Sequence, residues 1–179
     1  MADKQDELLY RIAITLIPGI GHINARKLIS WAGGAEKIFR QPRNELLMIP
    51  GMAKLLGPVV NTGDLLRRAE LELKFITNNN IRALYYYDED YPERLKHCPD
   101  SPLMLYLKGN EDFKAERYLG VVGTRNATAY GQRMCQEIIE GFSDEDIVIV
   151  SGMAYGIDSC AHRRSLSAGL RTLGVLAHG

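Results

Sequence analysis

Short, continuously apolar segments alternate with amphipathic ones in the last third of the chain, and this alternation limits the fold more than any other feature. It predicts strands over residues 118–122, 147–150 and 172–176, and helices over 129–142 and 157–168. Apolar strands joined by helices are typical of a parallel sheet that is covered on both faces. We therefore expect an α/β fold with a partial Rossmann-like parallel sheet in this region.

The sequence stops at Gly179, directly after the third of these strands. In a sheet of only three strands, that last strand would present unpaired N–H and C=O groups along an exposed edge. We therefore expect the native protein to continue beyond Gly179.

The first 80 residues are predicted to be helical instead. Apolar residues recur every three or four positions, as Leu8, Ile12 and Leu16 illustrate, and Pro-Gly and Gly-Gly pairs interrupt the pattern. A longer amphipathic helix is predicted over residues 64–76. Three consecutive asparagines end it, because Asn competes for helical hydrogen bonds and tolerates the left-handed conformation. We therefore predict an all-helical N-terminal domain over residues 1–80.

The second predicted domain, residues 81–179, begins before the alternating region. Apolar and aromatic residues predict a strand over 81–87, and a second one over 103–107. The residues between them, 88–102, are predicted to form a loop with a short helix. These elements lead into the Rossmann-like part of the domain.

A glycine-containing turn, IPGIG (residues 17–21), joins the first two predicted helices. Its glycines allow a tight hairpin whose N–H groups can bind a DNA phosphate without reading sequence. A weaker copy, IPGM, occurs at residues 49–52. Together they resemble a helix-hairpin-helix or SAM-like domain. A turn that needs glycine only for its backbone conformation, and a protein–protein role, are the open alternatives.

A glycine-containing loop, GVVGTRNATAYG (residues 120–131), begins at the first parallel strand. Ligands bind doubly wound sheets at the carboxyl ends of strands, where helix N-termini face the crevice. Gly123 permits close backbone approach, Thr124 and Thr128 offer hydroxyls, and Arg125 offers a permanent charge suited to phosphate. The loop matches neither the GxGxxG dinucleotide fingerprint nor a P-loop. We predict an anion site; the alternative is a structural turn whose arginine forms a surface ion pair.

The next predicted strand ends in a similar loop, SGMAYGID (residues 151–158). Two such loops on parallel strands share one rim of the sheet, and their N–H groups form an anion-binding ledge. Asp158 in the first helical turn would stabilise the following helix. The candidate DNA- and phosphate-binding residues of the two loops are Gly123, Thr124, Arg125, Thr128, Ser151, Gly152, Met153, Ala154, Tyr155 and Gly156.

Ser151, Asp158 and His162 have the residue types of a hydrolytic triad, but their context argues against one. Asp158 and His162 are four residues apart on one helix face and can touch. Ser151, however, is not in a GxSxG elbow, and no oxyanion loop is evident. The four histidines show no metal-ligand spacing. We therefore expect no catalytic residue, metal or cofactor, and His162 to be a packed histidine with satisfied hydrogen bonds.

Composition limits the ways in which such a chain could bind DNA and indicates its cellular compartment. The formal net charge is zero, so DNA binding would depend on local pockets of Arg and backbone N–H groups. Three cysteines without a CxxC pair fit a reducing compartment. The N-terminus lacks the apolar segment of a signal peptide, and no apolar run approaches the ~20 residues of a membrane helix. We therefore expect a cytoplasmic protein without a membrane partner.

Several runs resemble one family in order and spacing. VVGTRNATAYG, IVIVSGMAYGIDSCAH and LRTLGVLAHG are similar to the start of the Rossmann-like domain of the DNA-processing protein A (DprA/Smf) family. YYYDEDYPERLKHCPDSPLMLYLKG resembles the segment that precedes it, so the resemblance covers residues 81–179. It implies a non-enzymatic protein that binds and protects incoming single-stranded DNA, forms a homodimer through the Rossmann-like domain, and loads the RecA recombinase in natural transformation.

By this resemblance, Arg125 matches the arginine of the family's DNA pocket, and Ser151, Gly152 and Gly156 match its second loop. Tyr155 stands where many members carry Lys or Arg. A tyrosine there removes a phosphate contact, but its ring can stack on a base. The family's later basic and dimer-forming segments lie beyond the end of this sequence.

The main alternative is a nucleotide-binding or nucleotide-hydrolysing enzyme on the same scaffold, similar to phosphoribohydrolases that act on nucleoside monophosphates. Those enzymes typically show a PGGxGT loop with a nearby Glu, and neither occurs here. A third interpretation is a sensor that binds a free nucleotide on the same ledge without chemistry. Competition by a mononucleotide separates both alternatives from a protein that binds a polymer.

Overall fold

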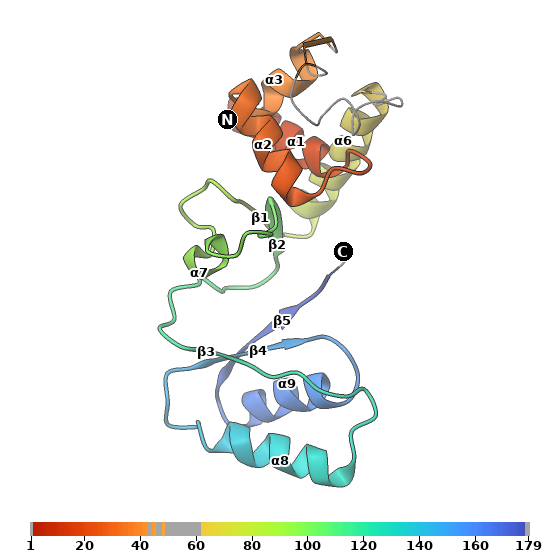
Figure 1. Cartoon of the computed structure of the whole chain (residues 1–179). Helices are drawn as coiled ribbons and strands as arrows, with labels where there is room; N and C mark the ends of the chain where they lie inside the picture. The colour runs from red at the N-terminus through yellow and green to blue at the C-terminus, as the bar shows by residue number, and fades with distance from the viewer. Residues whose placement is uncertain (1, 43, 46–47, 49–61, 178–179) are drawn as a thin grey trace. The chain divides into compact units, whose positions relative to one another are not determined.

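The computed structural model describes residues 2–42, 44–45, 48 and 62–177. The chain divides into two compact units, Met1–Asn110 and Glu111–Gly179 (Figure 1). Helices dominate the first unit, and a parallel sheet with two helices forms the second. The predicted α/β class, with helical structure at the N-terminus and a partial Rossmann-like sheet after it, is confirmed.

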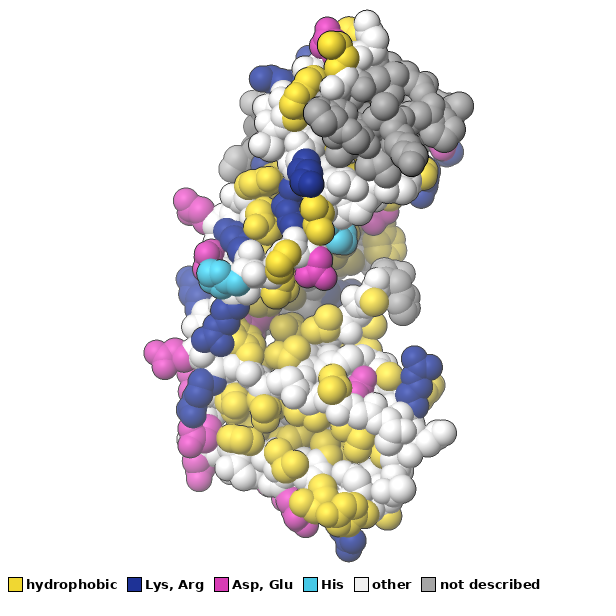
Figure 2. All heavy atoms as spheres, viewed as in Figure 1, with side chains coloured by type: hydrophobic (Ala, Val, Ile, Leu, Met, Phe, Trp, Pro, Cys, Tyr) yellow, Lys and Arg dark blue, Asp and Glu magenta, His cyan; other side chains and the backbone are white. Residues whose placement is uncertain are grey.

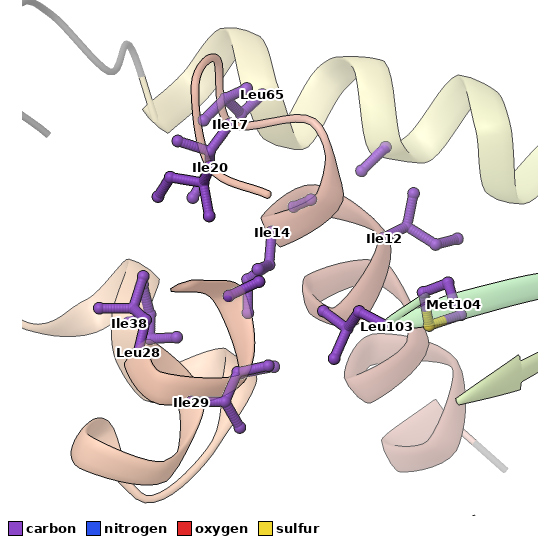
Figure 3. Close-up of a cluster of buried hydrophobic side chains, with 14 of the residues drawn as sticks. Ile12, Ile14, Ile17, Ile20, Leu28, Ile29, Ile38, Leu65, Leu103 and Met104 are labelled. Atoms are coloured by element: carbon purple, nitrogen blue, oxygen red, sulfur yellow. The ribbon is translucent and has the colours of Figure 1, made fainter. Parts of the chain in front are cut away.

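Four described helices of the N-terminal unit pack around a hydrophobic core. Their bounds are α1 Ala2–Thr15, α2 His22–Ala32, α3 Ala35–Arg40 and α6 Thr62–Asn78. Ile12, Leu28 and Leu65 are buried in this core and come from three of the helices (Figure 3). Helix α6 contains the predicted helix 64–76, and Asn80 has the left-handed φ of 52° just after it. The apolar periodicity of the sequence therefore marks the buried face of each helix.

The turn between α1 and α2 has the geometry that its glycines predict. Gly19 has a φ of 77°, and Gly21 precedes α2 as an N-cap residue that makes no side-chain cap. Ile17 and Ile20 are buried in the core, so the turn also closes the helical bundle (Figure 3). The second turn of this kind, residues 49–52, lies outside the described residues.

An antiparallel pair of strands follows α6. The bounds are β1 Arg82–Tyr85, α7 Glu93–Lys96 and β2 Met104–Leu107. Arg82 pairs with Leu107, and Tyr85 pairs with Met104. These elements confirm the predicted strand, short helix and strand of this segment.

The strand pair belongs to the helical core rather than to the parallel sheet. Leu103 and Met104 are buried in the same cluster as the helices (Figure 3). Tyr85 is buried in this cluster as well. Because these side chains complete that core, the compact unit extends to Asn110, whereas the sequence placed the division after residue 80. The domain limits 1–80 and 81–179 stay a prediction.

The C-terminal unit follows the predicted alternation of strands and helices. The bounds are β3 Tyr118–Gly120, α8 Ala129–Glu140, β4 Val148–Gly152, α9 Ile157–Ser167 and β5 Arg171–Val175. The strands are parallel and lie in the order β3-β4-β5. The carboxyl ends of β3 and β4 therefore meet at one rim of the sheet.

The expectation that helices cover both faces of the sheet is wrong for this part of the chain. Helices α8 and α9 lie side by side on one face (Figure 1). The reason is the strand order, which follows the order along the chain. Two successive right-handed crossovers that move in the same direction place both helices on the same face. Their core contains Ile139, Ile149, Cys135 and Cys160.

Two buried tyrosines of the N-terminal unit make its stability sensitive to alkaline pH. Burial raises the pKa of Tyr85 to about 12, although the Arg11 guanidinium, 4.0 Å from the ring centroid, partly opposes the shift. Burial likewise raises the pKa of Tyr91 to about 12, and its hydroxyl donates to the Pro102 carbonyl at 2.7 Å. In the unfolded chain, a tyrosine ionises near a pKa of about 10.

We expect the contribution of these two tyrosines to the free energy of unfolding to be constant below about pH 9 and to fall between about pH 10 and 12, because the unfolded state loses these protons first. Near pH 11 the loss is about 1.4 kcal/mol for each ring. Denaturant titration at increasing pH measures it. The variant Tyr85→Phe should keep the neutral-pH stability and show a shallower alkaline decline. An unchanged decline in that variant contradicts the assignment.

Candidate nucleic-acid interface

The loop after β3 presents Arg125 to solvent. Its side chain is exposed and makes no ion pair or hydrogen bond with any residue that the structure describes. The ion pair that the alternative interpretation requires is therefore not found among the described residues. Three residues later, Thr128 is the N-cap of α8 and accepts a hydrogen bond from the Gly131 N–H at 3.1 Å. A guanidinium without a carboxylate partner keeps its full charge for a ligand.

The two candidate threonines have partly occupied hydroxyls. Thr128 Oγ1 accepts from Gly131, and Thr124 Oγ1 accepts from the Asn126 N–H at 3.2 Å. Both hydroxyls act as acceptors in these contacts, so each O–H group is still available as a donor. The N–H groups of Ala129 and Tyr130, in the first turn of α8, have no acceptor within their own helix. The start of α8 thus offers several donors close to Arg125.

Backbone contacts clamp the first loop to the start of α9. The Ile157 N–H donates to the Thr124 carbonyl at 3.1 Å. Gly156 has a φ of 88°, and a Cβ atom there would overlap the carbonyl oxygen of Thr124. The two predicted loops therefore meet, as expected for loops at the carboxyl ends of neighbouring parallel strands.

Packing gives a further reason why residue 123 is a glycine. A Cβ atom on Gly123 would lie 2.6 Å from Cβ of Ile157, and one on Gly131 would lie 3.7 Å from Ile157 Cδ1. The space that a side chain at residue 123 would need is therefore filled by Ile157, while Gly123 itself is exposed. Ile157 locks α9 against the first loop and the first turn of α8. Its apolar side chain carries no sequence signal for this role, which only the packing reveals.

The second loop divides into buried and exposed residues. Ser151 is buried, and its hydroxyl donates to the Val121 carbonyl at 2.6 Å, so it ties β4 to β3. Gly152 is half-buried, and a Cβ atom there would lie only 2.6 Å from Oδ2 of Asp158. Ala154 is half-buried as well. Tyr155 is 85% exposed, so its ring is available to a ligand.

Met153 belongs to the exposed part of the second loop but lies against the neighbouring strand. Its side chain is 61% exposed. A Cβ atom on Gly174 in β5 would lie 3.1 Å from the Met153 Cγ. Met153 therefore covers the end of β5, and its outer surface faces solvent.

His162 is a packed histidine, as predicted, and does not form a triad with Ser151. Its Nδ1 lies 2.7 Å from Thr172 Oγ1, and its Nε2 lies 2.8 Å from the Gly152 carbonyl. Both ring nitrogens are therefore engaged, while the Ser151 hydroxyl is directed at Val121. Asp158 lies in the first turn of α9 and is 9% exposed, so a carboxylate also stands near this rim. The positive charge of the rim comes from Arg125 and the helix N-termini rather than from a basic patch.

Among the described residues, no group of three or more His, Cys, Asp or Glu side chains is placed to hold a metal ion. No helix in the described part of the chain has the length and apolar character to cross a membrane.

The helical unit is followed along the chain by a three-stranded parallel sheet whose strand-end loops are held together. The chain is therefore an α/β protein with a Rossmann-like sheet. Within that class, the family described as DNA recombination-mediator protein A matches residues 82–179. The chain belongs to this family.

Relatives and a solved structure agree with this assignment. DNA processing protein DprA of Bacillus subtilis is 41% identical over 100 residues, which cover 55% of this chain and 34% of that protein. Protein Smf of Synechocystis is 28% identical over 178 residues, which cover 97% of this chain and 44% of that protein. The X-ray structure of DNA processing protein A from Streptococcus pneumoniae has a TM-score of 0.66 at 24% identity, over 96% of this chain and 58% of the other, and it supports the fold. The chain thus spans less than half the length of these two sequence relatives.

Proposed function

We propose that the chain binds single-stranded DNA in a sequence-tolerant way, with phosphate held at the two strand-end loops. The observation that carries this proposal is the exposed Arg125, which has no partner among the described residues and stands where the loop is clamped between α8 and α9. Arginine and N-terminal N–H groups suit phosphate oxygens and read no base. Tyr155, exposed on the second loop, supplies a ring on which a base can stack.

The wider role is also a proposal, because the chain spans less than half the length of the two sequence relatives. Membership in a recombination-mediator family supports a non-enzymatic function in which a homodimer protects incoming DNA and loads the RecA recombinase in the cytoplasm during transformation. Four of the other predicted residues, Gly123, Ser151, Gly152 and Gly156, then act by holding the loops in place. The contacts of His162 and Ser151 favour this proposal over a hydrolytic one that uses these two side chains.

Arg125→Ala tests the proposal. We expect weaker binding of a labelled oligo-dT, by about tenfold or more, because a hydrogen bond to a charged group is worth about 1.5–3 kcal/mol. The slope of log K against log salt should fall by about one, with equal effects on mixed sequences. Fluorescence anisotropy at several salt concentrations measures both quantities.

The matched control is Arg163→Ala, which removes the same charge from an exposed position further along α9. It should leave the salt slope close to that of the wild type. Equal slopes for the wild type and Arg125→Ala would refute the phosphate site. A mononucleotide that displaces the oligonucleotide, or is turned over, would favour the nucleotide enzyme or sensor instead.

A further inference from the structure

An open groove of about 590 Å³ lies in the N-terminal unit, and none of the predicted site residues lines it. It is lined by Arg26, Lys27, Ser30, Trp31, Tyr86 and Tyr87. The first four belong to α2, and the two tyrosines directly follow β1. Figure 2 shows Lys and Arg side chains beside hydrophobic ones over α2 on the visible face of this unit. The volume falls within the range of small-molecule sites.

The groove presents aromatic rings that are exposed and yet held in place. Trp31 is 47% exposed and Tyr87 is 53% exposed. The Tyr87 ring packs against Tyr86, with 5.1 Å between centroids, and against Tyr85, with 5.4 Å between centroids. Tyr85 is itself buried. A ring that is fixed from behind loses little freedom when a flat ligand stacks on it, so Tyr87 is a preorganised stacking surface.

The groove is also positively charged, without a compensating acid in its lining. The Arg26 guanidinium donates to the carbonyl oxygens of Pro99 and Ser101 and lies 4.6 Å from the Tyr86 ring centroid. These partners are neutral, so they position the guanidinium without cancelling its charge. Lys27 is exposed and makes no ion pair with a residue that the structure describes. None of the six lining residues is acidic.

We infer that this groove is a binding site for single-stranded nucleic acid. An unpaired base stacks on Tyr87 or Trp31, and a backbone phosphate lies near Lys27 and Arg26. Stacking needs an open base face, which a duplex does not offer, so the site selects single strands. Aromatic grooves also take proline-rich peptides, but two cations without an acid in the lining favour a polyanion. This inference does not depend on the strand-end loops, because the groove lies wholly within the N-terminal unit.

The chain offers its own probe, because Trp31 is its single tryptophan. We expect oligo-dT to quench the Trp31 emission in a saturable, salt-dependent way, and an abasic strand of equal length to leave it unchanged. Tyr87→Ala should weaken the quenching titration about tenfold, the loss expected for one stacked base. Lys27→Ala should lower its salt slope by about one. Tyr106→Ala, which removes an exposed tyrosine outside the groove, should match the wild type.

The Arg125→Ala variant separates this groove from the strand-end loops. If oligo-dT still quenches Trp31 emission in Arg125→Ala, the groove binds DNA independently of the strand-end loops. This holds even if the affinity measured by anisotropy falls. Anisotropy that reports binding while Trp31 emission stays constant would overturn the groove site and leave the loops as the site. Quenching by the abasic strand, or by a proline-rich peptide at lower concentrations than oligo-dT, would overturn it as well. The comparison of oligonucleotides uses wild-type protein, so it does not depend on the folding of a variant.

Discussion

Gly156→Ala should lower the free energy of unfolding of the C-terminal unit by about 3 kcal/mol or more. Gly156 has a φ of 88° and a ψ of −127°, a region that side-chain-bearing residues avoid. An added Cβ would also meet the carbonyl groups of Thr124 and Arg125, which are backbone and cannot rotate away. Relief requires the first loop to separate from α9, which breaks the hydrogen bond between Ile157 and Thr124. We therefore expect DNA binding at the loops to be lost together with stability.

Hydrogen exchange of the α9 and β4 amides measures this effect within the C-terminal unit. Gly120→Ala is the matched control, because a Cβ atom on Gly120 meets nothing within 4 Å and its φ is not positive. It should change the exchange of α9 very little. Equal protection in Gly156→Ala and the wild type would contradict the clamp between the two loops.

Leu103→Ala should destabilise the N-terminal unit by about 3 kcal/mol, although Leu103 lies after the predicted domain boundary. Leu103 is fully buried in the cluster that the helices form. Truncation removes transfer energy and leaves a cavity among packed side chains. Trp31 lies in the same unit, so its emission during denaturant unfolding follows this loss.

Ile139→Ala is the control, because Ile139 is equally buried but belongs to the core of the C-terminal unit. It should leave the transition that Trp31 reports near its wild-type midpoint. If Leu103→Ala leaves that midpoint unchanged too, the strand pair is not part of the helical core, and the boundary after residue 80 is supported instead.

Much of the secondary structure could be predicted from local sequence. The predicted helix 157–168 corresponds to α9, Ile157–Ser167, and the strand 118–122 corresponds to β3, Tyr118–Gly120. Apolar periodicity identifies such elements because the buried face must be apolar whatever it packs against. The predicted helix 129–142 corresponds to α8, Ala129–Glu140, and the structure adds that Thr128 caps it, a local interaction between a side chain and the next turn.

The sequence also determined which residues gather at one rim. The motifs after β3 and β4 predicted neighbouring loops because parallel strands bring their carboxyl ends together. Arg125 and Tyr155 are exposed there, whereas Ser151 is buried. A sequence motif does not separate these cases, because exposure depends on what packs above each residue.

Only the tertiary structure decided three further features: the placement of both helices on one face of the sheet, the joining of β1 and β2 to the helical core, and the groove between α2 and the residues after β1. Each depends on contacts between residues far apart in the chain. Ile157 shows the same principle at the site, because an ordinary apolar residue fills the space beside Gly123 and fixes both loops. Local sequence determines which elements form, and long-range packing determines which faces meet and which are left for a ligand.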